Sequence, residues 1–525
     1  MYRINQMSLP IEFDWADIRS SLAEKIKVDK SLITYCKLSR LSIDARNKQN
    51  ICYKASIVFD TNTPLNLERM RNVEKYTPHL FPKKYWLANQ KEIIVVGSGP
   101  SGLFTALVLA EAGAKVTILE RGYEMSKRII ACNKLFENGE LDVVSNIQFG
   151  EGGAGTFSDG KLNTGIKSEY IDYVLETFHK YGAPENILYD SHAHIGTDIL
   201  SDVVVNIRHR LEAIGVKVLF EHQLIDCDIV DGRINSIYVK NDNNIMQMPC
   251  DLLVLAIGHS SRDTIRMLVN NNLAIKQKPF SMGYRIEHLQ KEINMRQYGK
   301  YADLLPPADY HLSKKLDNGR TIYTFCMCPG GVVVPAMSES GTVVTNGMSY
   351  HDRAGVNSNS AVLINVNPED FGGDDVLAGV ELQERWEKYA YEKNGTIRAT
   401  VQRVGDFLAG VPSDKLGKVK PTYRPGYVLG TVEDMLPKFV VDSVKMGLPK
   451  LAELLPDFDE PNAILTGIET RSSAPYQVIR NQDMESSIGG VYAIGEGAGF
   501  AGGIVSSAVE GIKCAFALID KYGKM

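Results

Sequence analysis

The first apolar pattern along the chain has helical spacing. Residues 14–28 place an apolar side chain on one face at every turn, which predicts an amphipathic helix. Two β-branched stretches follow at 33–44 and 51–59, with a polar turn between them, and predict strands. Together they predict a small α+β module, which we place at residues 1–88.

The strongest local pattern lies between residues 91 and 121. Ile93–Val96 is an unbroken β-branched run, which is typical of a buried parallel strand. An apolar helical stretch over 103–112 and a second strand over 115–119 follow it. The order predicts a strand–helix–strand unit with parallel strands.

A glycine motif joins the first strand of this unit to its helix. Gly97 permits a tight turn, Gly99 lets the backbone approach a pyrophosphate, and Gly102 lets helix and strand pack closely. Glu120, after the second strand, can accept hydrogen bonds from ribose hydroxyls. Both FAD and NAD contain the ADP that this unit binds. The dinucleotide contacts predicted here are Gly97, Ser98, Gly99, Pro100, Ser101, Gly102 and Glu120.

A second glycine-rich element near the C-terminus favours FAD. Residues 490–494 predict a strand, and a helix is expected to start near Gly503. The arrangement resembles the C-terminal flavin motif of the glutathione-reductase-like flavoprotein superfamily. The resemblance implies that Gly495 and Glu496 lie at the ribityl chain, and that Gly502, Gly503 and Ile504 face the flavin ring.

Three further elements follow the order of that superfamily. Residues 251–258 resemble its third strand, and 222–228 resemble the strand whose backbone pairs with adenine. The polar loop 150–164 resembles a flavin-proximal loop, and an ordinary surface turn is the alternative. The contacts that these elements imply are Gly153, Thr156, Ser158, Leu224, Ile225 and Gly258.

Arg121 and Arg128 are candidates to neutralise the pyrophosphate, with solvated surface positions as the alternative.

The narrowest resemblance rests on four strings, at 194–198, 255–263, 323–331 and 495–504. They resemble a bacterial family of FAD-dependent, or NAD(FAD)-utilising, dehydrogenases, along nearly the whole chain. The family implies bound FAD and gives no substrate. No second dinucleotide motif occurs, so NAD(P)H is expected at most as a transient electron donor without its own Rossmann domain.

The chain has 525 residues, which is too long for one core and predicts several domains. We expect an α/β fold in which a Rossmann-like FAD-binding domain is assembled from segments 89–275 and 461–525. An inserted α+β substrate domain is expected at 276–460. The composition is that of a globular protein, with 44% hydrophobic and 23% charged residues.

Net charge and cysteine usage limit the partners and the compartment. The formal net charge of −5 offers no basic surplus for nucleic acid or an anionic membrane. The N-terminus has no continuous apolar signal segment, and eight cysteines are scattered through the chain. We expect a cytoplasmic protein with reduced thiols and no metal site.

Cys326 and Cys328 are the first candidates for chemistry. In a strand they would point to one face, where they could exchange electrons with a flavin. The spacing would close a strained disulfide, and no further ligands accompany the pair for a metal. The alternative is two small apolar residues packed in a sheet.

His194 and Arg471 are the other catalytic candidates. His194 could act as a general acid near the flavin, although Thr197 or Asp198 capping a helix explains most of its motif. Arg471 could pair with a substrate carboxylate, the flavin carbonyls or a neighbouring acid. Tyr284, Arg285 and His351 are further polar candidates without an assigned role.

The function that these patterns favour is an FAD-dependent oxidoreductase. It would transfer hydride or electrons through flavin N5 to or from a small substrate. One alternative is a reductase whose protein partner docks on residues 1–88. Another is an RNA- or protein-binding factor with structural or modification-linked FAD, supported only by basic residues around 37–48. The alternative without a binding function is that residues 1–88 form a structural module that covers the flavin domain.

Overall fold

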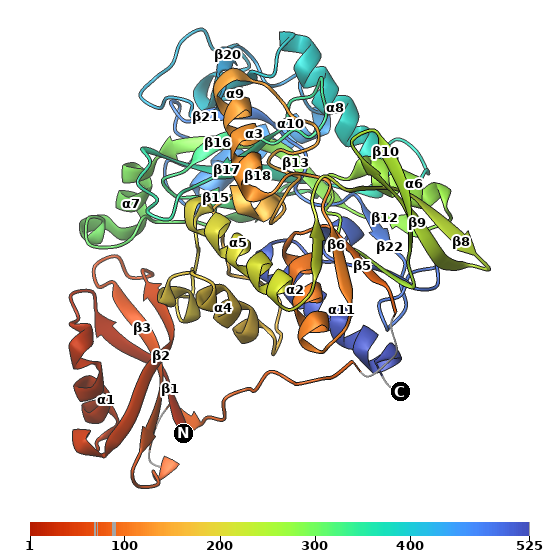
Figure 1. Ribbon diagram of the computed structural model, residues 1–525. Coiled ribbons are helices and arrows are strands. Elements are labelled where there is room, and N and C mark those ends of the chain that lie inside the picture. The colour runs from red at the N-terminus through yellow and green to blue at the C-terminus, as the bar shows by residue number, and fades with distance from the viewer. Residues whose placement is uncertain (68–69, 71, 87–90, 524–525) are drawn as a thin grey trace.

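The computed structural model describes residues 1–67, 70, 72–86 and 91–523, and forms three parts (Figure 1). A small N-terminal module packs beside a parallel-sheet domain, and a large, mostly antiparallel sheet with helices lies above the parallel sheet. The predicted boundary between residues 88 and 89 lies outside the described residues. No helix in the described part of the chain is long and apolar enough to span a membrane.

The N-terminal module is a four-stranded sheet of order β2-β3-β1-β4 with one covering helix. Its helix is shorter than predicted, because a 3-10 turn over Trp15–Asp17 precedes it. Leu22, Ile26 and the β3 residue Phe59 are buried in its core. The elements are β1 (Tyr2–Pro10), α1 (Ile18–Ile26), β2 (Ile33–Asp44), β3 (Cys52–Thr61) and β4 (Val73–Lys75).

The module is fastened to the rest of the chain through strand β2. The Leu41 amide donates to the Tyr189 carbonyl at 2.6 Å, and the Ser191 amide donates to the Leu41 carbonyl at 2.8 Å. The predicted basic cluster has intramolecular partners. Lys37 pairs with Glu185, Arg40 donates to Ser191, Arg46 pairs with Asp44, and Lys48 donates to the Arg296 carbonyl.

The parallel sheet has five strands in the order β23-β11-β5-β6-β7, the strands coming from four separated stretches of chain. This confirms the predicted α/β class. Helices α2 and α11 lie side by side, and a Cβ on Gly511 would come within 2.2 Å of the Ser101 carbonyl oxygen. The elements are β5 (Ile93–Val96), α2 (Pro100–Glu111), β6 (Val116–Leu119), β7 (Lys217–Leu219), β11 (Leu252–Leu255), β23 (Val491–Ala493) and α11 (Ile504–Tyr522).

Two insertions interrupt this sheet. The first carries α3, α4 and α5, and the second is an antiparallel meander of order β10-β9-β8. Helix α3 and the β9–β10 hairpin were not predicted. The elements are α3 (Met125–Asn138), α4 (Ile171–Lys180), α5 (Thr197–Ala213), β8 (Gln223–Val230), β9 (Arg233–Asn241), β10 (Asn244–Pro249) and α6 (Arg262–Asn270).

The upper domain is built on a seven-stranded sheet of order β14-β15-β18-β13-β21-β19-β20. Strand β21 belongs to this sheet, although the sequence assigned residues 461–525 to the FAD-binding part. The chain returns to the parallel sheet only at β23. The sheet strands are β13 (Phe280–Leu289), β14 (Ser313–Lys315), β15 (Thr321–Cys328), β18 (Asn357–Val366), β19 (Ala399–Arg403), β20 (Tyr427–Leu429) and β21 (Ile464–Glu469).

Helices and two short strand pairs complete the upper domain. The strand pairs are antiparallel, one joining β12 to β22 and the other joining β16 to β17. The elements are α7 (Gln290–Tyr298), α8 (Ala378–Asn394), α9 (Val404–Ala409), α10 (Lys438–Ala452), β12 (Ile275–Gln277), β16 (Val332–Pro335), β17 (Thr345–Met348) and β22 (Tyr476–Val478).

Candidate active site at the carboxyl ends of the parallel strands

A cavity lies where the parallel strands end, between the parallel sheet and the seven-stranded sheet. It encloses about 1540 Å³ of space between protein atoms, part of it open to solvent. Residues directly after β5, β6 and β11 line it together with Glu496, three residues after β23, and this edge is where open α/β sheets bind ligands. Residues of β15 and β21 form the opposite wall.

Two helix N-termini point at this cavity. Gly99 is the N-cap residue of helix α2, and Gly503 is the N-cap residue of helix α11. Neither glycine has a side chain that could cap its helix. Both N-cap residues line the cavity. The first amides of each helix lack intrahelical partners and carry the positive end of the helix dipole, so both ends suit an anionic ligand.

The glycines of the first turn serve different purposes. A Cβ on Gly97 would lie 2.3 Å from the Ala256 carbonyl oxygen, and one on Gly102 would lie 1.9 Å from the Gly97 carbonyl oxygen. Both glycines are therefore required by the protein's own packing. A Cβ on Gly99 would have no protein atom nearer than 3.9 Å and would project into the cavity space instead. The room kept at Gly99 fits a pyrophosphate.

Protein donors hold the carboxylate of Glu120, the residue predicted to bind the ribose. Glu120 accepts from the Gly122 and Gly150 amides through Oε1, and from the amide and hydroxyl of Ser98 through Oε2. These four donors match the four acceptor positions of a carboxylate. A ribose hydroxyl would share or replace one of them.

Near the second helix, a buried polar atom has no protein partner. Nε2 of His259 is buried and makes no hydrogen bond, while its Nδ1 lies 3.4 Å from Glu496. Both side chains line the cavity. The free ring nitrogen and the carboxylate suit the polar ribityl chain of FAD. The glycine turn, the two helix ends and this pair fit FAD.

Fourteen of the predicted cofactor residues line the cavity and six do not. Those that line it are Gly97, Ser98, Gly99, Pro100, Ser101, Glu120, Arg121, Gly153, Ser158, Leu224, Gly258, Glu496, Gly503 and Ile504. Those placed outside its wall are Gly102, Arg128, Thr156, Ile225, Gly495 and Gly502.

The predicted role of Arg128 is wrong. Its side chain is fully buried and donates to the backbone carbonyls of Asn146, Ile147, Gly150 and Glu151. The guanidinium organises the loop behind Glu120, and because it is fully buried away from the cavity wall it cannot reach a pyrophosphate there. Arg121 does line the cavity, but it forms a two-bond pair with Asp263.

His194 lies away from the cavity wall. Its Nε2 lies 2.9 Å from the His351 carbonyl oxygen, the two imidazoles stack at 5.3 Å, and burial lowers the pKa of His194. The predicted caps are also wrong, because Gly196 is the N-cap of α5. The Thr197 hydroxyl donates to the Thr156 carbonyl, and Asp198 accepts from the His351 amide. This motif therefore ties loops together.

Cys326 lines the cavity and Cys328 is buried behind it. A bulge between Phe325 and Cys328 interrupts the β15–β18 ladder, and Cys326 has φ of 45°. The prediction that both side chains point to one face of a regular strand is thus wrong here, although the two cysteines remain neighbours. A hydrogen bond from Cys328, assisted by Arg285, lowers the pKa of Cys326 to about 6 despite burial.

Beneath the thiols lies a buried ion pair. Arg285 donates from Nη1 to both carboxylate oxygens of Glu469 at 3.1 Å, and from Nη2 to the Cys326 carbonyl at 2.7 Å. Burial raises the pKa of Glu469 to about 7, and the neighbouring Cys326 adds to the rise. Glu469 lines the cavity, so a carboxyl that titrates near neutrality faces the space beside the thiol.

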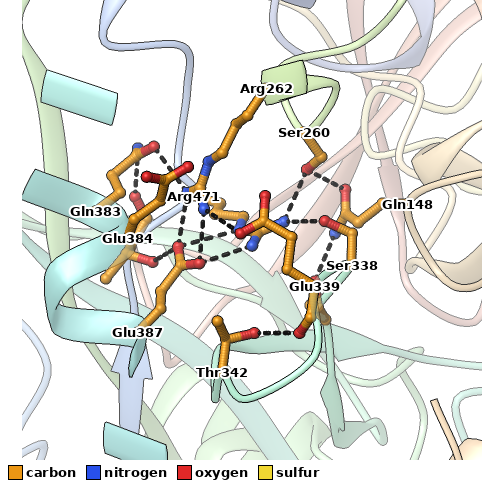
Figure 2. A network of polar contacts seen from close by, with 12 residues as sticks. Gln148, Ser260, Arg262, Ser338, Glu339, Thr342, Gln383, Glu384, Glu387 and Arg471 are labelled. Atoms are coloured by element: carbon orange, nitrogen blue, oxygen red, sulfur yellow. Dashed lines mark hydrogen bonds and ion pairs between the residues drawn. The ribbon is translucent and has the colours of Figure 1, made fainter. Parts of the chain in front are cut away.

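Arg471 belongs to a buried polar network (Figure 2). Its Nε and Nη2 donate to Glu387, and its Nη1 donates to Ser260 and Ser338. Arg262 makes a second two-bond pair with the same carboxylate, and although burial opposes it, the two arginines lower the pKa of Glu387. The fork of Arg471 is thus engaged by Glu387, a neighbouring acid, and is not free for a substrate carboxylate.

The network also reaches the cavity. Two arginines share Glu387, and Arg471 reaches the cavity wall beside Ser260 and Gln148 (Figure 2). Neither Arg262 nor Glu387 was predicted from the sequence. Six residues of the cavity wall were not predicted as site residues either: Asp159, Lys161, His259, Asn346, Glu469 and Ser472. They come from loops and from strands β17 and β21, and nothing local in the sequence indicates that they meet.

Fold and cavity together define an FAD-binding protein of the α/β class, and comparison with known proteins agrees. Residues 90–132 match the FAD binding domain family, and residues 279–472 match the family described as FAD-dependent protein, C-terminal domain-like. Residues 1–59 match a domain of unknown function.

A full-length relative gives the family. An uncharacterized protein of Clostridium beijerinckii (strain ATCC 51743 / NCIMB 8052) is 43% identical over 532 residues, covering 99% of each chain. The present chain belongs to the same family as that protein.

Solved structures with related folds are more distant. A flavin-dependent brominase matches with a TM-score of 0.39 at 13% identity, over 83% of this chain and 81% of its own. A glycerol-3-phosphate dehydrogenase from Bacillus halodurans, complexed with FAD, matches with a TM-score of 0.36 at 12% identity, over 82% and 65%. The assignment of the class rests on the strand order and the family matches.

Proposed function

We propose that the protein is an FAD-dependent oxidoreductase that acts on a small molecule held between the flavin and the wall formed by β15 and β21. The observation that carries the proposal is the convergence on one cavity of a phosphate-binding turn, two uncapped helix N-termini and a wall of titratable side chains. A cofactor-binding protein without catalysis would not need the last of these.

Each part of the cavity has a task in this proposal. The α2 amides would hold the pyrophosphate, and His259 with Glu496 would hold the ribityl chain. The N-terminus of α11 would stabilise negative charge on the ring. When bound, FAD supplies two-electron chemistry at N5. Cys326, Glu469 and Lys161 face the remaining space, where they can bind the substrate and move protons.

The electron donor is open to a direct test. Binding of NAD(P)H remains a prediction. Among the described residues there is one five-stranded parallel sheet, which the proposal assigns to FAD, so NAD(P)H would have no such sheet of its own. Anaerobic addition of NADH or NADPH to FAD-reconstituted protein should bleach the visible flavin absorbance if a nicotinamide is the donor. Flavin that only dithionite reduces would indicate reduction by a substrate or a protein partner. Protein that does not take up FAD would contradict the proposal.

A further inference from the structure

One cysteine in the cavity wall and a second one directly behind it are not themselves required by the proposed electron transfer. Cys326 and Cys328 are two residues apart, and both are free thiols. Cys326 faces the cavity, and Cys328 lies directly behind it with no exposed surface. Two packed apolar residues would instead both be expected in the core of the sheet.

The surroundings hold the Cys328 thiol beside the Cys326 backbone, and the two thiols are close enough to interact. Nη2 of Arg285 donates to the Cys326 carbonyl oxygen at 2.7 Å and contacts the Cys328 sulfur at 3.5 Å. The Cys328 thiol also lies 3.4 Å from the Cys326 carbonyl oxygen. The local backbone departs from a strand, with a bulge and a left-handed residue at Cys326. Left-handed non-glycine residues cluster at functional sites.

Based on this geometry we propose that Cys326 and Cys328 form a redox-active dithiol that reduces a small disulfide entering the cavity. The inference rests on the proposed oxidoreductase function and names a substrate class for the same site. A disulfide closed over so short a spacing is strained, and strained disulfides belong to the labile and catalytic kind.

The step balances as thiol–disulfide exchange. The Cys326 thiolate attacks one sulfur of the substrate, the substrate S–S bond breaks, and one substrate thiolate leaves. Cys328 then loses its proton and attacks the Cys326 sulfur, so that an Sγ–Sγ bond forms and the second substrate thiol leaves. The substrate gains two electrons and two protons: one proton is that of Cys328, and the other, given up when the Cys326 thiolate formed, comes back from Glu469 on the same wall. Reduced flavin is the class of reductant that returns two electrons to the protein disulfide.

Nearby charges suit this chemistry. Lys161 on the cavity wall and Arg285 beneath it place positive charge beside the thiolate. Glu469 on the same wall can hold or release the proton that the leaving thiol needs. The buried cysteines elsewhere differ, because burial raises the pKa of Cys132 to about 11 and that of Cys514 to about 12.

Mass spectrometry of the thiols tests the inference. The full chain, reconstituted with FAD, is equilibrated anaerobically with oxidised glutathione or with dithiothreitol, then acid-quenched and labelled with N-ethylmaleimide. We expect the peptide that contains residues 326 and 328 to lose both labels on oxidation, and to regain both on reduction. Cys132 and Cys514 should keep their labels after unfolding in both samples.

Two variants make the result specific. Cys328→Ser should trap glutathione as a mixed disulfide on Cys326, and Cys326→Ser should trap none on Cys328. Cys132→Ser is the matched control and should behave as wild type. Retention of both labels on the 326–328 peptide in oxidised glutathione would overturn the inference.

The two proposals can fail separately. If FAD is bound and reducible but the 326–328 peptide keeps both labels, the dithiol proposal is wrong and the proposed oxidoreductase function still stands. A dithiol that forms in a protein unable to bind FAD would overturn the proposed function, because the labelling itself needs no flavin.

Discussion

The two walls of the cavity are built in different ways. The wall at α2 comes from one continuous stretch of chain and works through backbone amides and missing side chains. The opposite wall comes from β15, β21 and their neighbours, which pair with strands far away in sequence, and works through charged side chains. A backbone site can therefore be recognised from local sequence, while a side-chain site depends on the whole fold.

The walls also differ in what stabilises them. At the turn, glycines remove atoms that would clash, as Gly97 does next to Ala256. Behind the wall formed by β15, β21 and their neighbours, buried charges must find partners, as Glu387 does between Arg262 and Arg471. Removing one partner leaves a buried charge unpaired, so we expect the largest losses of stability behind the wall formed by β15, β21 and their neighbours.

The largest effect is expected for Glu387→Gln. The substitution removes the charge that both buried arginines share, and we expect a loss of about 3–5 kcal/mol in the free energy of unfolding. Denaturant unfolding measures it. Glu384→Gln is the control, because its partner Arg266 is more than a third exposed, and it should cost less than about 1 kcal/mol. Equal losses in the two variants would contradict the account.

The next effect separates the two glycines of the turn. Gly97→Ala adds a Cβ that clashes with the Ala256 carbonyl at a φ of 105°, and the conformational strain alone should cost about 1–3 kcal/mol of stability. Gly99→Ala places its Cβ no nearer than 3.9 Å to any protein atom and should change stability by less than about 0.5 kcal/mol. Thermal unfolding of the FAD-free proteins measures both. A larger loss at Gly99 than at Gly97 would show that the division of roles is wrong.

A third prediction concerns the thiol at the wall formed by β15, β21 and their neighbours. Because the pKa of Cys326 is lowered to about 6, its thiolate persists at neutral pH and is lost as the pH falls through 6. The rate of iodoacetamide alkylation at Cys326 should therefore rise between about pH 5 and 7, with Glu469, Arg285, Lys161 and Asp159 as the charged groups around it.

Cys328→Ala should move this profile upward, because it removes the hydrogen bond that lowers the pKa of Cys326. Peptide mass spectrometry after timed alkylation gives the rates. A wild-type profile that rises only near the ordinary thiol pKa of about 8.5 would contradict the assignment of Cys326 as the activated thiol.

The smallest effect is expected for Ser98→Ala. The hydroxyl donates to Glu120 at 2.7 Å, but the Ser98 amide donates to the same oxygen at 3.0 Å and stays in the variant. We expect a loss of about 1 kcal/mol in stability and less than about a threefold change in FAD affinity. Calorimetric titration with FAD measures the affinity. A loss of more than tenfold would mean that the hydroxyl contacts the cofactor directly.

What could be predicted from the sequence also differs between the two walls. Gly99 and Glu120 could be placed at the cavity because strand, turn and helix lie next to one another in the chain, and Gly503 because its segment resembles a known flavin motif. Arg128 was misassigned because its partners are carbonyls of a loop that folds back on it. Glu387 and Glu469 gave no local pattern, since only helix α8 and strand β21 in their final positions bring them to Arg471 and Arg285.

The central claim is that the cavity above α2 holds FAD through the space kept at Gly99. The most direct measurement is the molar ratio of FAD retained by wild type and by Gly99→Val after reconstitution and gel filtration. The account predicts about one FAD per chain for wild type. It predicts almost none for a Gly99→Val protein that unfolds at the same temperature as the FAD-free wild type. A folded Gly99→Val protein that retains FAD like the wild type would contradict it.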